Sequence, residues 1–113
     1  MLLRDVALTL AIDAVKLTAY ALNRNHPRGQ HKARLFEAVL GYNVENYRDL
    51  LKEIETKALD SQAQPLRVDE YGRHYRVDIA VTGANGNQAT VRTGWLVMIG
   101  QNNAILTTLY VRG

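Results

Sequence analysis

The spacing of hydrophobic residues changes about halfway along the chain. Between residues 13 and 60, apolar residues recur every three or four positions, which is typical of amphipathic helices. From residue 66 onward they alternate with polar residues, which is typical of half-buried strands. This order predicts an α+β domain with two or three N-terminal helices packed on a four- or five-stranded, mainly antiparallel sheet. The length of 113 residues fits a single domain over 1–113, with a mainly helical half (1–60) and antiparallel strands (66–112).

The N-terminal part is predicted to begin with an extended segment. Residues 6–12 alternate between apolar and small or polar side chains, which predicts a short strand or arm. Asp13 is then placed to cap a short amphipathic helix that reaches Leu22. Pro27 cannot continue that helix, so the connection to the next one lies there.

Two further helices are predicted from apolar spacing. The first covers residues 30–40, and Gly41 is placed to end it in a left-handed conformation. Asn43 is placed to cap the second, over residues 44–59. Residues 60–65 then read as a polar linker.

The strand half is divided by three turn segments at 71–72, 83–87 and 100–103. The expected strands cover 66–70, 73–82, 89–99 and 104–111.

The facing of the last two strands decides which residues share a surface. Strict alternation in the last strand groups Leu106 with Thr108 and Tyr110. If Trp95 and Leu109 face the helices, then Arg92, Thr108 and Tyr110 lie together on the other face. That grouping depends on the register of the sheet.

A basic segment connects the helices. Between Arg24 and Arg34 there are four Lys or Arg residues, two of the three histidines and no acidic residue. Two of these cations fall in the first turn of helix 30–40, where they oppose the helix dipole but favour a bound anion. We therefore predict a phosphate-binding corner at this helix start. The overall charge of +3 is compatible with a nucleic-acid partner.

Composition excludes several kinds of site. The chain has no cysteine, which excludes disulfides, thiolate metal sites and a cysteine nucleophile. Ser61 is the only serine and lacks a nucleophile-elbow context, and no phosphate-binding glycine loop occurs. His26 and His31 have no carboxylate nearby in sequence to complete a metal site. No metal and no cofactor are predicted.

The N-terminus does not resemble a signal peptide, and no apolar run is long enough to span a membrane. We expect a cytoplasmic protein with no membrane partner.

Two segments resemble a family of small, uncharacterised bacterial domains of unknown function. The first contains His26-Pro27-Arg28-Gly29 followed by Lys32-Ala33-Arg34-Leu35-Phe36, a His-Pro-x-Gly and Lys-Ala-x-x-Phe motif. The second contains Val91-Arg92-Thr93-Gly94-Trp95 and the closing strand. The helix-then-sheet order of such domains is distantly similar to the barnase/EndoU/colicin/RelE-like ribonuclease toxin fold.

The resemblance implies a metal-independent, toxin-like endoribonuclease, or a relative with a phosphate-binding corner. In such ribonucleases, basic residues, a histidine and Thr or Tyr side chains line a sheet face. The matching catalytic positions here are His26, His31, Arg92 and Tyr110. The matching phosphate-binding positions are Arg28, Lys32, Arg34 and Thr108.

Each of these residues also has an ordinary structural explanation. His26 can be a turn residue, His31 a solvated side chain, and Arg92 a partner of Asp78 across the sheet. The alternative function is a non-catalytic protein-interaction or immunity-type module that binds a protein partner. The enzyme hypothesis predicts that the site residues converge in one cleft. The module hypothesis predicts that they scatter and that an apolar patch or free sheet edge appears instead.

Overall fold

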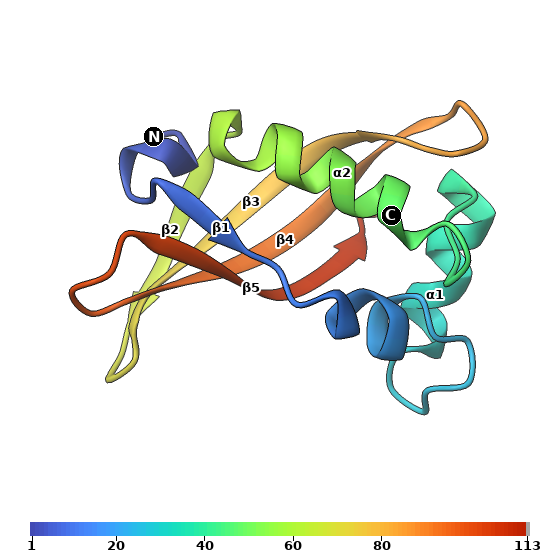
Figure 1. Cartoon of the computed structure of the whole chain (residues 1–113), viewed down its shortest axis with the longest axis horizontal. Helices are drawn as coiled ribbons and strands as arrows, with labels where there is room; N and C mark the ends of the chain where they lie inside the picture. The colour runs from blue at the N-terminus through green and yellow to red at the C-terminus, as the bar shows by residue number, and fades with distance from the viewer. Residues whose placement is uncertain (113) are drawn as a thin grey trace.

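The computed structural model describes residues 1–112. Its centre is a five-stranded sheet in the order β1-β5-β4-β3-β2 (Figure 1). Each of the strands β2 to β5 pairs antiparallel with the next one along the chain, and β1 pairs parallel with β5. The predicted α+β class with a mainly antiparallel sheet is therefore confirmed. The strands are β1 (Thr9–Ala11), β2 (Ala63–Val68), β3 (Gly72–Thr82), β4 (Gln88–Met98) and β5 (Asn103–Val111).

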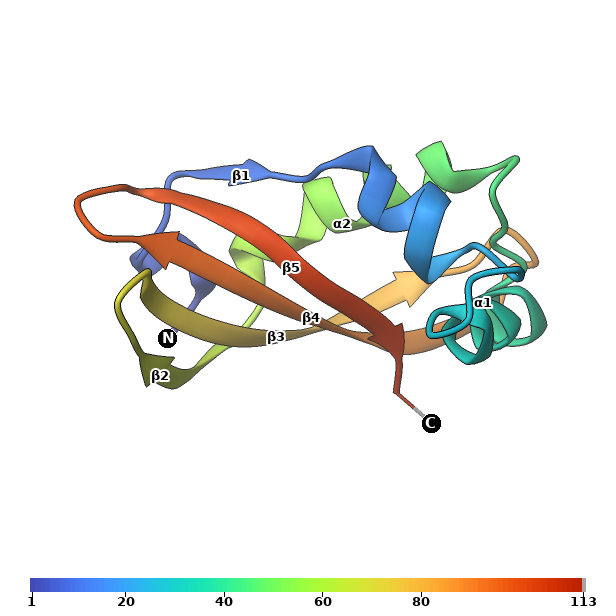
Figure 2. The same cartoon turned by 90° about the horizontal axis from the view of Figure 1, so that it is seen from below.

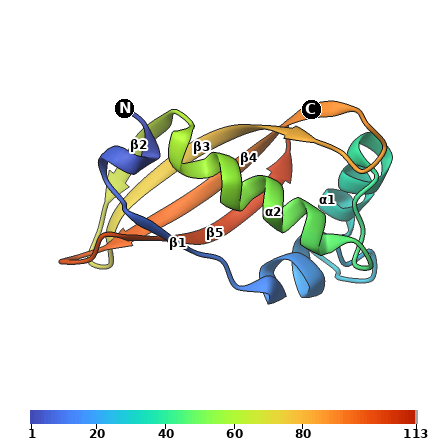
Figure 3. The same cartoon turned by 45° about the horizontal axis from the view of Figure 1, so that its top comes forward.

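The helices gather on one face and at one end of this sheet. α2 runs diagonally across the sheet (Figure 3), and α1 lies at the end where β5 finishes (Figure 2). Among the described residues, no helix crosses the opposite face of β3 and β4, which we call the open face. No helix in residues 1–112 is long and apolar enough to cross a membrane. The helical segments are η1 (Leu3–Asp5), η2 (Lys16–Ala21), α1 (Gln30–Leu35), η3 (Phe36–Leu40), α2 (Tyr47–Lys57) and η4 (Ala58–Asp60).

The core lies between α2, η3 and the inner face of the sheet. Alternate residues of β3 and β4 point inward, as the period-2 pattern predicts. α2 contributes Leu50 and Ile54, and η3 contributes Phe36 and Leu40. β3 and β4 contribute Tyr75, Val77, Ile79, Val81, Val91, Trp95 and Val97, and β5 contributes Ala104, Leu106, Leu109 and Val111.

Helix 30–40 is present as α1 continued by η3, and Gly41 ends it with φ of +72°, as predicted. The third helix begins at Tyr47 instead of residue 44. Asn43 does not cap it, because its Oδ1 accepts hydrogen bonds from the backbone N–H groups of Glu45 and Asn46 and forms a turn ahead of the helix.

The predicted linker 60–65 is partly wrong, because β2 begins at Ala63 and pairs there with Val77 of β3. Pro65 is tolerated inside β2 because this strand lies at the edge of the sheet.

A β-bulge in β5 sets the facing of the last strand. Gly94 lies opposite Thr108, but Trp95 lies opposite Leu106, so Thr107 is an extra residue in β5. Strict alternation would therefore misplace Leu106, which is buried in the core. Beyond the bulge, Thr108 and Tyr110 face the open side together with Arg92, as the sequence predicted.

Candidate functional site

The basic helix start meets the end of β5 through one lysine. Lys32 of α1 places its Nζ 3.3 Å from Oγ1 of Thr108. The same Nζ lies 5.0 Å from the ring centroid of Tyr20 and 5.4 Å from that of Tyr110, so two cation–π contacts hold it. No carboxylate of the described residues lies within 4 Å of it. We call Tyr20, Lys32, Thr108 and Tyr110 the α1–β5 corner; its positive charge has no ion-pair partner in residues 1–112.

Arg92 extends this corner across the open face. It lies directly opposite Tyr110 in the register, and its guanidinium donates two hydrogen bonds to Asp78, at 3.0 and 3.2 Å. Asp78 also accepts a hydrogen bond from Arg112 at 3.2 Å. The expected alternative, a cross-sheet pair between Arg92 and Asp78, is therefore confirmed.

The ion pair between Arg92 and Asp78 favours the charged form of both side chains. The hydrogen bond from Arg92 lowers the pKa of Asp78 despite partial burial, and the charges of the neighbouring arginines add to the effect. The hydrogen bonds to Asp78 raise the pKa of Arg92 above its ordinary value, and the nearby phenol of Tyr110 adds to the effect. Arg92 is thus a fixed cation whose guanidinium is already bound on one side.

His26 has a structural role in the turn before α1. Its Nδ1 accepts hydrogen bonds from the backbone N–H groups of Arg28 and Gly29, each at 3.0 Å. Gly29 is needed because a Cβ there would lie 2.3 Å from the carbonyl oxygen of Tyr20. The His26 ring meets the Tyr20 ring edge-on, with centroids 4.8 Å apart. The His-Pro-Arg-Gly sequence therefore builds the turn that positions Tyr20.

These hydrogen bonds also limit the chemistry of His26. An Nδ1 that accepts two N–H groups carries no proton, so the neutral ring must carry its proton on Nε2. His26 can then donate a hydrogen bond from Nε2 to an anion. It cannot act as a general base at that atom while the turn is intact.

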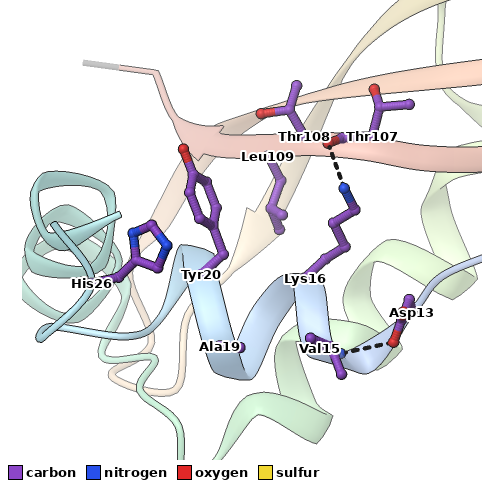
Figure 4. Close-up of a pocket in the computed structure, with 9 residues that line it drawn as sticks. All are labelled: Asp13, Val15, Lys16, Ala19, Tyr20, His26, Thr107, Thr108 and Leu109. Atoms are coloured by element: carbon purple, nitrogen blue, oxygen red, sulfur yellow. Dashed lines mark hydrogen bonds between the residues drawn. The ribbon is translucent and has the colours of Figure 1, made fainter. Parts of the chain in front are cut away.

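A pocket of about 420 Å³ lies between η2 and the outer edge of β5. Figure 4 shows Lys16 and Tyr20 projecting from η2 toward this strand, with the ring of His26 beside that of Tyr20. Lys16 Nζ donates to the backbone carbonyl of Thr107 at 3.4 Å, so the lysines of η2 and α1 both reach the β-bulge. The full lining is Asp13, Val15, Lys16, Ala19, Tyr20, His26, Thr107, Thr108 and Leu109.

The predicted site residues are thus partly brought together. Lys32, Thr108, Tyr110 and Arg92 form one continuous group, and His26 joins it through Tyr20.

The other predicted site residues are not part of that group. His31, Arg28 and Arg34 are exposed, and none of their side chains bonds to a described residue of the corner. No group of three His, Asp or Glu side chains in residues 1–112 is arranged to hold a metal ion.

Two contributors were not predicted as site residues. Lys16 and Tyr20 are four residues apart, a spacing that places two side chains on one side of a helix. That spacing was a usable signal, but only the structure shows that this side faces the β5 edge.

A family model described as a domain of unknown function (DUF6883) matches residues 2–113. No curated protein and no solved structure gives a significant match to the chain. The expected similarity to ribonuclease toxins therefore stays a prediction. The family model covers nearly the whole sequence, and the chain therefore belongs to the DUF6883 family of domains of unknown function.

Proposed function

We propose that this domain binds single-stranded RNA by its phosphodiester backbone at the α1–β5 corner. The observation that carries the proposal is the Lys32 ammonium, which lies between two tyrosine rings and beside the Thr108 hydroxyl without a carboxylate partner in residues 1–112. Cations that track phosphates, next to aromatic rings on which bases stack, are the usual means of holding a single strand.

The surroundings of the corner support a phosphate rather than a carboxylate ligand. Lys16 adds positive charge at the β-bulge, and Arg92 and Arg112 together exceed the charge of the one carboxylate, Asp78, that binds them. The Thr108 hydroxyl can donate to a phosphate oxygen. The Nε2–H of His26 supplies one more donor at the pocket.

A more specific hypothesis adds cleavage to binding: the corner also cleaves RNA without a metal ion, as a toxin-like ribonuclease. In that reaction the 2′-oxygen bonds to the adjacent phosphorus while the bond from phosphorus to the 5′-oxygen breaks. A base takes the 2′-hydroxyl proton, an acid protonates the 5′-oxygen, and cations stabilise the phosphate. Lys32 and Arg92 supply the positive charge that stabilises the phosphate. Tyr110 supplies a phenol O–H beside them. Since His26 holds the turn, we assign as base the other predicted site histidine, His31, which lies outside the corner group but is exposed next to Lys32 at the start of α1.

One observation favours the alternative of a protein-interaction module. Large apolar side chains are exposed at the far end of the sheet: Val68 is 76% exposed, Ile99 73% and Tyr71 60%. A backbone hydrogen bond from Ile99 to Tyr71 joins two of them. Exposed apolar groups that gather in this way are typical of protein-binding surfaces.

The test measures binding and cleavage of a labelled single-stranded RNA in EDTA. We expect Lys32→Gln to weaken binding about fivefold and to lower the slope of log K against log salt by about 0.7. Lys52→Gln, on the exposed side of α2, is the matched control and should bind like the wild type. Absence of RNA binding by the wild type at low salt would refute the proposal.

For the cleavage step, His31→Ala should bind RNA normally and no longer release 2′,3′-cyclic phosphate ends. Cleavage that persists in both His31→Ala and Lys32→Gln would show that it does not arise at this corner.

A further inference from the structure

The open face of the sheet carries a basic residue that the α1–β5 corner does not use. Arg76 of β3 lies directly opposite Gly94 of β4, which lies directly opposite Thr108 of β5. Residues that are paired in this way point to the same side of the sheet. Arg76, Gly94 and Thr108 therefore form one row that runs from the middle of the open face to the corner.

Gly94 keeps the centre of this row flat. A Cβ at Gly94 would lie 3.0 Å from both Thr107 Oγ1 and Thr108 Cγ2, so any side chain would press on the β-bulge. A glycine inside a strand is also a place where a ligand backbone can approach closely. The surface of the sheet therefore carries no side chain at Gly94, between the Arg76 cation and the Thr108 hydroxyl.

The positive charge of Arg76 is not neutralised by a contact. Asp78 is its nearest acidic neighbour along β3, but both carboxylate oxygens accept hydrogen bonds from Arg92 and Arg112. No carboxylate of residues 1–112 lies within 4 Å of Arg76, and the side chain makes no hydrogen bond with the described residues. Its guanidinium, which could bind a phosphate through two parallel hydrogen bonds, is therefore available.

A hollow of about 400 Å³ lies beside this guanidinium. It is lined by Arg76 and Asp78 from β3, by Gln62 and by the first three residues of β2, 63–65. Gln64 is the register partner of Arg76, so its amide stands next to the cation as a second donor.

We propose that Arg76 and Gln64 form a second phosphate subsite for the same RNA strand that the corner holds. This inference rests on the proposed function. The strand passes from Lys32 over Thr108 and Gly94 to Arg76, which is two strand spacings or roughly 10 Å from β5. The row gives the strand its direction: across the sheet, away from α1.

The test compares decauridylate binding by four variants at several salt concentrations, with thermal melts to check folding. Arg76→Gln should weaken binding about fivefold and lower the salt slope by about 0.7, since one phosphate contact is lost. Arg76→Lys should keep the slope and lose part of the affinity, because the charge stays and the fork is lost. Arg73→Gln is the matched control: it removes the same charge from the same strand, at an exposed position on the other face.

The fourth variant, Lys32→Gln, separates this inference from the proposed function. If Lys32→Gln weakens binding while Arg76→Gln behaves like Arg73→Gln, the subsite is refuted and the corner stands. If the wild type does not bind decauridylate, both are refuted.

Discussion

Replacing Asp78 by asparagine separates the stability of the open face from its ability to bind RNA. The Asp78 carboxylate holds Arg92 through two hydrogen bonds and Arg112 through a third. The introduced asparagine would keep the shape of the side chain but lose its charge. We therefore expect Asp78→Asn to lower stability and to raise RNA affinity.

The loss of stability follows from the pKa of Asp78, which the hydrogen bond from Arg92 holds below its ordinary value. A carboxyl group with a lowered pKa stabilises the fold fully above the unfolded-state pKa of about 3.9, and this stabilisation disappears as the pH falls through the folded-state pKa. Because the pair is partly exposed, we expect a loss of about 1 kcal/mol near neutral pH. That corresponds to a decrease in Tm of about 4 °C. The difference between wild type and variant should shrink below pH 4 as Asp78 is protonated.

The gain in RNA affinity follows from the two arginines that Asp78 releases. Arg92 and Arg112 could then each contact a phosphate, which would steepen the salt slope by up to about 1.4 for a single strand. Removing the acidic charge also removes its repulsion of the phosphates.

The assay is a pair of measurements on each variant: thermal unfolding from pH 3 to pH 8, and decauridylate binding at several salt concentrations. Asp60→Asn is the control, because it breaks the ion pair between Asp60 of η4 and Arg4 and changes net charge equally. If Asp78→Asn is folded but binds RNA no more tightly than Asp60→Asn, then the open-face arginines do not contact RNA and the reasoning fails.

Two further substitutions test how the fold supports the site. Thr93→Val should lower the free energy of unfolding in urea by about 2 kcal/mol, because the buried indole N–H of Trp95 loses the Thr93 hydroxyl that accepts its hydrogen bond at 2.7 Å. Thr90→Val, on the open face of the same strand, should change this free energy by less than about 0.5 kcal/mol. Equal effects of the two substitutions would contradict the role given to Thr93. Gly29→Ala should lower the free energy of unfolding by about 1–3 kcal/mol, because the added Cβ overlaps with the Tyr20 carbonyl. It should also weaken RNA binding if that turn positions the corner. A variant with the wild-type Tm would show that the turn relaxes freely.

The hydrophobic pattern predicts the fold well wherever one element has a single face to bury. Helix 30–40 and the long strand through Ile79 were predicted from spacing and are present with nearly the same bounds. The errors occur where local hydrogen bonds compete with propensity. Asn43 forms a turn instead of a cap, and β2 extends into a polar segment because pairing with β3 satisfies its backbone.

The shared facing of Arg92, Thr108 and Tyr110 was predicted correctly, although strict alternation along the last strand did not hold. Placing Leu109 toward the helices gave the right face for Thr108 and Tyr110, but the bulge at Thr107, which makes Leu106 and Leu109 both inward, has no signal in the sequence. The contact between Lys32 and Thr108 spans 76 residues along the chain. Such a contact depends on how α1 packs at the sheet end, which spacing within one element does not specify.

The two histidines near the corner illustrate why a motif does not identify a catalyst. His26 lies in the most distinctive part of the sequence, yet its Nδ1 satisfies two backbone N–H groups, which is sufficient reason for a histidine at this position. A His26→Ala variant would therefore lose the turn and any activity together, and its inactivity would not show a catalytic role. The His31 side chain is exposed and makes no hydrogen bond to the described residues, so we expect its replacement to leave the fold intact. Loss of cleavage in His31→Ala, with RNA binding and Tm retained, would therefore identify His31 as the catalytic base. The same loss in His26→Ala would show only that the turn is needed to keep Tyr20 in contact with Lys32.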